Sequence, residues 1–135
     1  MDAIWDFPDE MDFVLRSLQA ERSVLEVWLI GSRVNGALHA ASDWDLFVIA
    51  DSQTTRDSPR AAGVDVLWQD PSGTVVLEGH HTAYEFLSFE WTVTGDGTAQ
   101  YIGKSSKHRV DGEIYDTDEP FFRSPRERAI RLWHR

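Results

Sequence analysis

The first part of the chain changes from a helical to an extended pattern of hydrophobic positions. Within residues 6–22, apolar side chains recur every three or four positions, which predicts an amphipathic helix; they are Phe7, Met11, Val14, Leu15 and Leu18. Residues 24–30 are almost continuously apolar, as expected of a strand buried on both faces. Residues 33–40 are predicted to form a short helix, with Ser32 as its N-cap.

Further strands are predicted in the middle of the chain, at residues 44–50, 64–68 and 74–77. The polar segment 52–63 is expected to be a loop or a short helix. A turn is expected at the sequence Pro71-Ser72-Gly73.

The second half of the chain alternates polar and apolar positions. Residues 84–93 predict a strand with one buried face, and the loop Gly95-Asp96-Gly97 predicts a hairpin that returns through 98–102. Residues 104–109 are expected to be a polar loop, followed by a turn at 111–112. Ser124 as N-cap and Pro125 in the first turn predict a final short helix.

A length of 135 residues fits one domain. Within it we distinguish a motif core (24–68), a β-rich extension (74–115) and a C-terminal helix (124–135). The chain is 41% hydrophobic and contains six Trp, which is enough for a core and argues against general disorder.

Charge and composition exclude several classes of protein. Thirteen Lys and Arg against twenty-three Asp and Glu give a net charge of −10, which makes binding of bulk nucleic acid unfavourable. The absence of Cys excludes a disulfide scaffold, a zinc knuckle and a thiol nucleophile. Residues 1–6 do not resemble a signal peptide, and no apolar run approaches the roughly 18 residues of a membrane span. We therefore expect a cytoplasmic protein without membrane contact.

One basic segment stands out on this acidic chain. Arginines recur near the C-terminus, at Arg123, Arg126, Arg128, Arg131 and Arg135. They fit a solvated helix end, where positive charge is favourable, and they also fit a surface for nucleic acid or an acidic partner. The sequence leaves both interpretations open.

Two carboxylates stand two residues apart at the start of the predicted strand 44–50. Asp43 and Asp45 therefore point to one face, where their repulsion favours a raised pKa or a bound cation. Mg²⁺ is a suitable cation because it prefers oxygen ligands. Asp65 lies in the next predicted strand and joins the cluster if the two strands are neighbours. Three carboxylates can hold two metal ions for an in-line phosphoryl displacement.

A complementary element precedes these carboxylates. Gly31 allows a close approach of the backbone to a phosphate, and the N–H groups after it, with the Ser32 hydroxyl, can bind phosphate oxygens. Arg33 is a further candidate for phosphate binding, although a surface helix position explains it equally well.

Together these elements resemble the signature of the DNA polymerase beta-like nucleotidyltransferase superfamily. Ile30-Gly31-Ser32 is followed by ten residues and then by Asp43-Trp44-Asp45-Leu46. The segment is most similar to the small prokaryotic minimal nucleotidyltransferase-domain proteins, and the resemblance extends over residues 6–68, with Asp65 at the place of the third carboxylate. Trp44 is bulkier than the usual Ile or Val, and the strand-rich half differs from the helical extension of many relatives.

The resemblance implies a fold, an activity and a set of roles. The fold is α/β (α+β), a mixed β-sheet flanked by helices. The activity is transfer of a nucleoside monophosphate from a nucleoside triphosphate to an acceptor hydroxyl on a small molecule, a protein or an RNA end. Asp43 and Asp45 would bind two Mg²⁺ ions, and Asp65 would bind the catalytic ion and help to deprotonate the acceptor. Gly31 and Ser32 would hold the triphosphate.

Two alternatives on the same fold remain. The protein could be a non-catalytic binding module, such as the antitoxin or regulatory partner of a helical HEPN-type protein. The resemblance implies such a partner, and a homo-oligomer is the other assembly that we expect. The same site could also transfer the phosphoryl group to water. The presence of all three carboxylates favours an active transferase.

Overall fold

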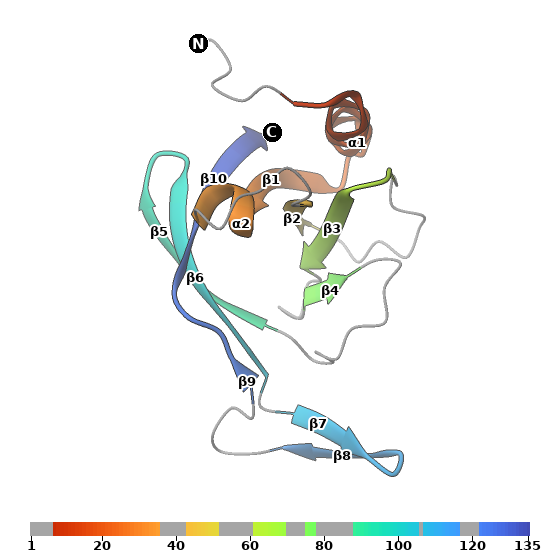
Figure 1. Ribbon diagram of the computed structural model, residues 1–135, viewed down its shortest axis with the longest axis vertical. Helices are drawn as coiled ribbons and strands as arrows, with labels where there is room; N and C mark the ends of the chain where they lie inside the picture. Colours follow the sequence, from red (N-terminus) through yellow and green to blue (C-terminus); the bar gives the residue numbers. More distant parts are fainter. Residues whose placement is uncertain are drawn as a thin grey trace.

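A helix and a strongly curved β-sheet dominate the computed structural model, which describes residues 7–35, 43–51, 61–69, 75–77, 88–105, 107–116 and 122–135 (Figure 1). The helices are α1 (Asp9–Ala20) and the single-turn α2 (Ser32–Asn35). The strands of the main sheet are β1 (Val24–Ile30), β2 (Trp44–Ala50), β3 (Val64–Gln69), β4 (Val75–Leu77), β5 (Ser88–Gly95), β6 (Thr98–Ser105), β9 (Phe122–Arg123) and β10 (Glu127–His134).

The main sheet is mixed, as the resemblance implies. Its order is β4-β3-β2-β1-β10-β6-β5, and β9 pairs with β6. Strands β2 and β3 are parallel, whereas the other described pairs are antiparallel. The C-terminal strand β10 thus lies in the middle of the sheet, between β1 and β6.

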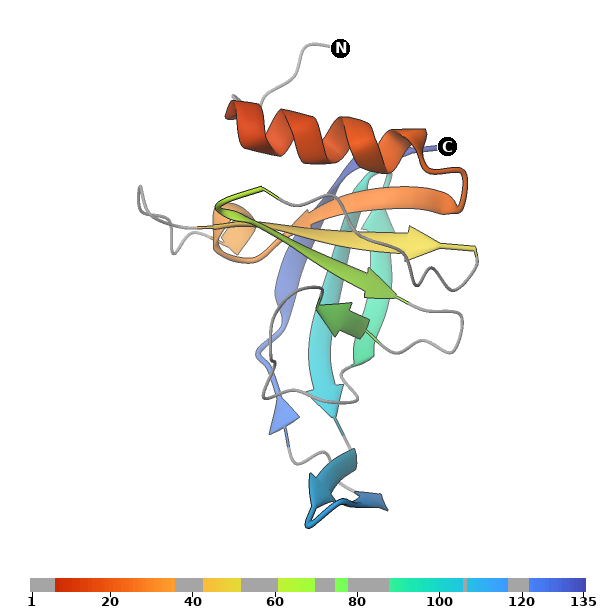
Figure 2. The same cartoon turned by 90° about the vertical axis from the view of Figure 1, so that its right-hand side faces the viewer.

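Helix α1 covers the outer face of the sheet, across β1 and β3 (Figure 2). Its apolar stripe is buried there, whereas Asp9, Glu10 and Asp12 stand in its first turn, where the helix dipole favours negative charge. Pro8 lies one residue before the helix. The predicted helix is therefore confirmed with narrower ends, and the stripe consists of Met11, Val14, Leu15 and Leu18.

A second apolar cluster fills the inner face of the curl. Strand β5 folds over β2 and β1, so that the Trp91 ring lies 5.0 Å from Phe47 and 4.9 Å from Trp28 between ring centroids. Along β2, Leu46 belongs to the cluster under α1 and Phe47 to the inner cluster. Because side chains alternate along a strand, Asp45 points to the inner face as well.

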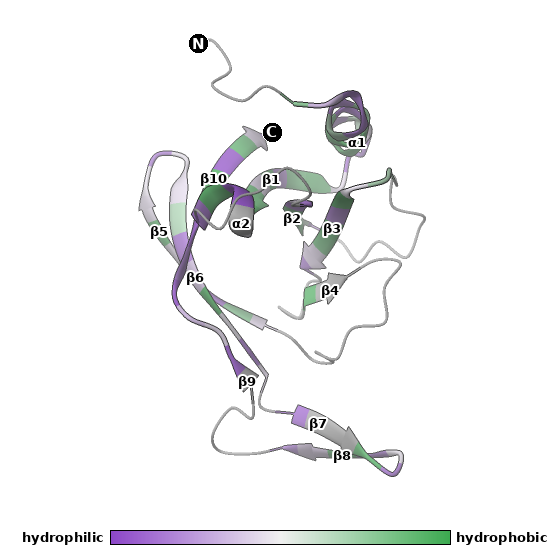
Figure 3. Cartoon of the chain, viewed as in Figure 1, coloured by the Kyte–Doolittle hydropathy of each residue, from purple (hydrophilic) through white to green (hydrophobic). Residues whose placement is uncertain are grey.

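The predicted C-terminal helix is wrong, because residues 127–134 form strand β10. Glu127 to Ile130 pair with β6, and β1 pairs with the other edge of the strand. Ser124 does not cap a helix: its hydroxyl accepts a hydrogen bond from the Gly103 backbone N–H at 2.8 Å. Figure 3 shows both hydrophilic and hydrophobic positions along β10.

The predicted polar loop at 104–109 is also wrong. Strand β6 continues to Ser105, and β7 (Lys107–Val110) pairs with β8 (Glu113–Asp116) in a separate hairpin that projects from the main sheet (Figures 1 and 2). The predicted turn at 111–112 is confirmed, with positive φ at both residues.

Strands β1 and β2 have the predicted bounds, and β3, β4 and the β5–β6 hairpin lie where they are expected. Several predictions fall outside the described residues. These are the turn at 71–73, most of the segment 52–63, the end of the second helix (36–40) and the beginning of the β5 strand (84–87). In the described part of the chain, no helix is long and apolar enough to cross a membrane.

Candidate active site

Two of the predicted carboxylates meet across neighbouring strands. Asp45 on β2 and Asp65 on β3 occupy paired positions of the parallel ladder, and their side chains share a hydrogen bond. Asp43 lies one residue before β2, close enough for its charge to act on Asp45. The structure thus brings the three carboxylates to the same end of two strands.

The environment of Asp45 disfavours its ionised form. Burial is the largest cause of a pKa raised to about 7 for the Asp45 carboxyl; the charges of Asp65 and Asp43, the hydrogen bond with Asp65 and the charge of Glu127 contribute in the same direction. A carboxylate pair in this state either keeps a proton or takes a cation. The carboxylate oxygens are the donors that Mg²⁺ prefers.

The conformation of Gly31 brings the backbone against this carboxylate. Its φ is +80°, and a Cβ atom on Gly31 would collide with Oδ2 of Asp45. Only glycine fits here, because it has no Cβ and accepts a positive φ. Gly31 therefore stands between the carboxylates and the start of α2, as a phosphate-binding turn requires.

Asn35 ties this turn to the C-terminal strand. Its Nδ2 donates hydrogen bonds to the backbone oxygens of Gly31 (2.9 Å) and Arg128 (3.1 Å), and its Oδ1 accepts one from the Arg128 N–H (2.8 Å). The guanidinium of Arg128 in turn donates to the Val34 oxygen at 3.2 Å. Strand β10 thus anchors the turn that follows β1.

Two more residues of the site come from the C-terminal half. The Tyr101 hydroxyl on β6 donates a hydrogen bond to Oε2 of Glu127 on β10 (3.0 Å), and Glu127 is one of the charges that act on Asp45. Sequence reasoning missed Tyr101, Glu127 and Asn35. The one available signal is weak: Glu127 is the single acidic residue in the arginine-rich C-terminal segment.

The remaining predicted site residues lie around the same turn. Ser32 begins α2. The Arg33 guanidinium lies over the Trp44 ring, 4.3 Å from its centroid, and Phe7 packs edge-on against the same ring. Trp44, which stands between Asp43 and Asp45 in the sequence, is thus a core residue under α1. Phosphate binding by Arg33 stays a prediction.

The side chains of the site fit a metal by their chemistry. Among the described residues, no three His, Cys, Asp or Glu side chains are already grouped around one position for an ion. Asp43, Asp45 and Asp65 nevertheless present oxygen donors at the starts of two adjacent strands, and a cation there would stabilise the ionised form of Asp45, which burial and the neighbouring charges disfavour.

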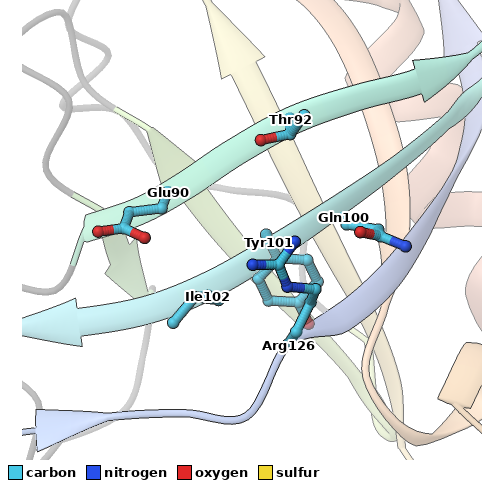
Figure 4. Close-up of a pocket in the computed structure, with 6 residues that line it drawn as sticks. All are labelled: Glu90, Thr92, Gln100, Tyr101, Ile102 and Arg126. Atoms are coloured by element: carbon cyan, nitrogen blue, oxygen red, sulfur yellow. The ribbon is translucent and has the colours of Figure 1, made fainter.

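A small pocket lies elsewhere, on the β5–β6 hairpin. Its volume is about 40 Å³, and Figure 4 shows the lining side chains, which come from β5, β6 and the residues before β10: Glu90, Thr92, Gln100, Tyr101, Ile102 and Arg126. None of the predicted site residues lines it. Of the residues that line it, Tyr101 also interacts with Glu127 and Gly31, beside the carboxylates.

One comparison with known proteins gave a match over part of the chain. Residues 14–67 match the family described as "Polymerase beta, Nucleotidyltransferase". Neither the curated proteins nor the solved structures gave a significant match. The matched segment runs from α1 into β3 and contains Gly31, Asp43, Asp45 and Asp65. Residues 14–67, less than half of the chain, are therefore similar to the polymerase beta nucleotidyltransferase family.

Proposed function

We propose that the protein is a Mg²⁺-dependent nucleotidyltransferase that moves a nucleoside monophosphate from a nucleoside triphosphate to an acceptor hydroxyl. The observation that carries this proposal is the paired placement of Asp45 and Asp65 on parallel strands, directly beside the positive-φ turn at Gly31. Carboxylates for cations and a backbone turn for phosphates are the two parts that the reaction needs.

Each part of the site has a separate task in this proposal. Asp43 and Asp45 bind the divalent cations, and Asp65 completes the ligand set from β3. The backbone N–H groups that follow Gly31, at the start of α2, bind oxygens of the triphosphate. When bound, Mg²⁺ neutralises the charge that develops on the phosphate oxygens during transfer.

The reaction is a displacement at phosphorus. The acceptor oxygen forms a bond to the α-phosphorus, and the bond from the α-phosphorus to the bridging oxygen breaks, which releases pyrophosphate. Asp65 accepts the proton of the acceptor hydroxyl, because a carboxylate at the start of β3 is placed beside the Asp45 ligand position.

A labelling experiment tests the proposal. The protein is incubated with Mg²⁺ and α- or γ-labelled triphosphates in the presence of small-molecule, protein and RNA acceptors. Transfer of the α-label with release of pyrophosphate is expected, and it should be lost in Asp45→Asn and Asp65→Asn. The control is Asp116→Asn on the projecting hairpin, which should remain active because its side chain is 75% exposed.

The label also separates the alternatives. Release of the γ-label as inorganic phosphate would indicate hydrolysis instead of nucleotidyl transfer. Mg²⁺-dependent binding of nucleotide without transfer to any acceptor would contradict the proposal and favour the binding-module interpretation.

A further inference from the structure

A partly buried hydrogen-bonded pair lies behind the proposed nucleotide site. Tyr101 and Glu127 are paired across β6 and β10, and the Tyr101 hydroxyl donates to Oε2 of Glu127 at 3.0 Å. Tyr101 is only 6% exposed, and its ring packs against Phe89 and Trp91. Burial, and then Glu127, raise the pKa of the Tyr101 phenol, so that it stays protonated and remains a donor.

The same hydroxyl also reaches the Gly31 turn. The backbone of Gly31 forms a hydrogen bond with the Tyr101 oxygen, and Asp45 lies close enough to act on the phenol electrostatically. Tyr101 therefore connects the Glu127 carboxylate with the turn that lies against Asp45. The connection runs from the C-terminal half into the segment that matches the nucleotidyltransferase family.

Asn35 supplies a second connection from the same turn to β10. It binds the Gly31 oxygen and both backbone groups of Arg128, the neighbour of Glu127. Two independent sets of hydrogen bonds thus fasten Gly31 to the C-terminal strands. A turn that must present its N–H groups to a triphosphate benefits from such preorganisation.

We propose that Tyr101 and Glu127 are positioning residues for nucleotide binding: their hydrogen bond holds the Gly31 turn at the correct place beside Asp45. This inference rests on the proposed function. In it, Glu127 acts as a hydrogen-bond acceptor for Tyr101 and not as a metal ligand, and the strand-rich half of the protein becomes part of the nucleotide site.

The test compares binding by variants that differ in one property. Titration calorimetry measures the affinity for ATP, GTP, CTP and UTP with Mg²⁺, and electron paramagnetic resonance measures the affinity for Mn²⁺ alone. Tyr101→Phe removes the hydroxyl but keeps the ring, and Glu127→Ala removes the acceptor. Glu127→Gln keeps an acceptor oxygen and removes only the charge.

The chain offers a matched control pair. On the projecting hairpin, the Tyr115 hydroxyl donates to Oε2 of Glu113 at the same distance, 3.0 Å, in an exposed position. Tyr115→Phe and Glu113→Ala therefore remove the same kind of hydrogen bond far from the site. Circular dichroism and melting temperature report whether each variant is folded, and Tyr101→Phe carries the test if Glu127→Ala does not fold.

The inference predicts a specific pattern. Tyr101→Phe and Glu127→Ala should weaken binding of the tightest nucleotide about three- to tenfold, the range expected for one hydrogen bond. Three results should stay within about twofold of the wild type. They are the Mn²⁺ affinity of Tyr101→Phe, the nucleotide affinity of Glu127→Gln, and both affinities of the control variants.

Other results would overturn the inference in distinguishable ways. If Tyr101→Phe bound nucleotide as tightly as the wild type, the Tyr101 hydroxyl would have no positioning role. Equal losses in Glu127→Gln and Glu127→Ala would show that the charge is what matters. If Asp45→Asn bound nucleotide and Mn²⁺ like the wild type, or if the wild type bound no nucleotide, the proposed function itself would fail, and this inference with it.

Discussion

Gly31 lies so close to the carboxylate of Asp45 that a Cβ atom at position 31 would overlap Oδ2. Its φ of +80° is unfavourable for any other residue as well. We predict that Gly31→Ala lowers the free energy of unfolding by about 2–4 kcal/mol, because the conformational cost and the collision add. Urea unfolding measures this change.

Gly112 separates the two contributions. It also has a positive φ, +84°, but nothing lies within 4 Å of the position of its Cβ. Gly112→Ala should therefore cost only about 1–2 kcal/mol and leave nucleotide binding intact. Similar losses in the two variants would show that the contact with Asp45 is not important.

The raised pKa of Asp45 makes the stability of the metal-free protein depend on pH. Since this pKa is about 7 in the folded state against 3.8 for an ordinary Asp, the folded protein binds more protons than the unfolded chain between these values. The free energy of unfolding should therefore fall as the pH rises through this window.

Asp45→Asn should remove this pH dependence, since asparagine does not ionise. At pH 8 we expect the variant to be more stable than the wild type, on the order of 2 kcal/mol. Urea unfolding between pH 4 and 8 in the presence of a chelator measures both proteins. A wild type whose stability is constant over this range, or an Asp45→Asn variant with the same slope, would be inconsistent with the proposed environment of Asp45.

Asn35 should control the local stability of the β10 start. Asn35→Ala removes its hydrogen bonds to Gly31 and Arg128, and we expect a loss of about 1–2 kcal/mol together with faster exchange of the Arg128 amide hydrogen. Asn35→Asp keeps an acceptor for that amide and should retain more of its protection. Unchanged exchange in Asn35→Ala would refute the anchoring role.

The inner cluster should depend strongly on Trp28. Its side chain is 1% exposed and packs edge-on against Trp91, so Trp28→Ala is expected to cost about 3–5 kcal/mol. Val93 on the same hairpin as Trp91 is 63% exposed, and Val93→Ala should change stability by less than about 0.5 kcal/mol. Denaturant unfolding followed by far-ultraviolet circular dichroism compares them.

The local pattern of apolar residues was sufficient to predict the strands of the first half of the chain. Strands β1 and β2 have the expected bounds because their apolar runs are long and are ended by Gly31 and Asp51. The resemblance to the nucleotidyltransferase signature also predicted that Gly31 and Asp45 belong together. Asp65 was expected to join them only if its strand lay beside that of Asp45, and the pairing of β2 with β3 meets that condition.

The C-terminal half depended on long-range pairing, which the local pattern does not contain. Ser124 and Pro125 carry the signals of a helix start, but the Ser124 hydroxyl binds the Gly103 backbone, and β10 is drawn into the centre of the sheet by partners on both sides. Tyr101 and Glu127 could not be predicted as parts of the site, because only the pairing of β10 with β1 and β6 brings them to Gly31.

A thermal-shift titration tests whether Asp45 is part of a Mg²⁺-dependent triphosphate site. Wild type and Asp45→Asn are heated with each of the four triphosphates, with and without Mg²⁺. We predict a stabilisation of the wild type that requires both Mg²⁺ and nucleotide, of about 2.7 kcal/mol at a hundredfold excess over Kd, and none in Asp45→Asn. No shift of the folded wild type with any triphosphate would contradict the account.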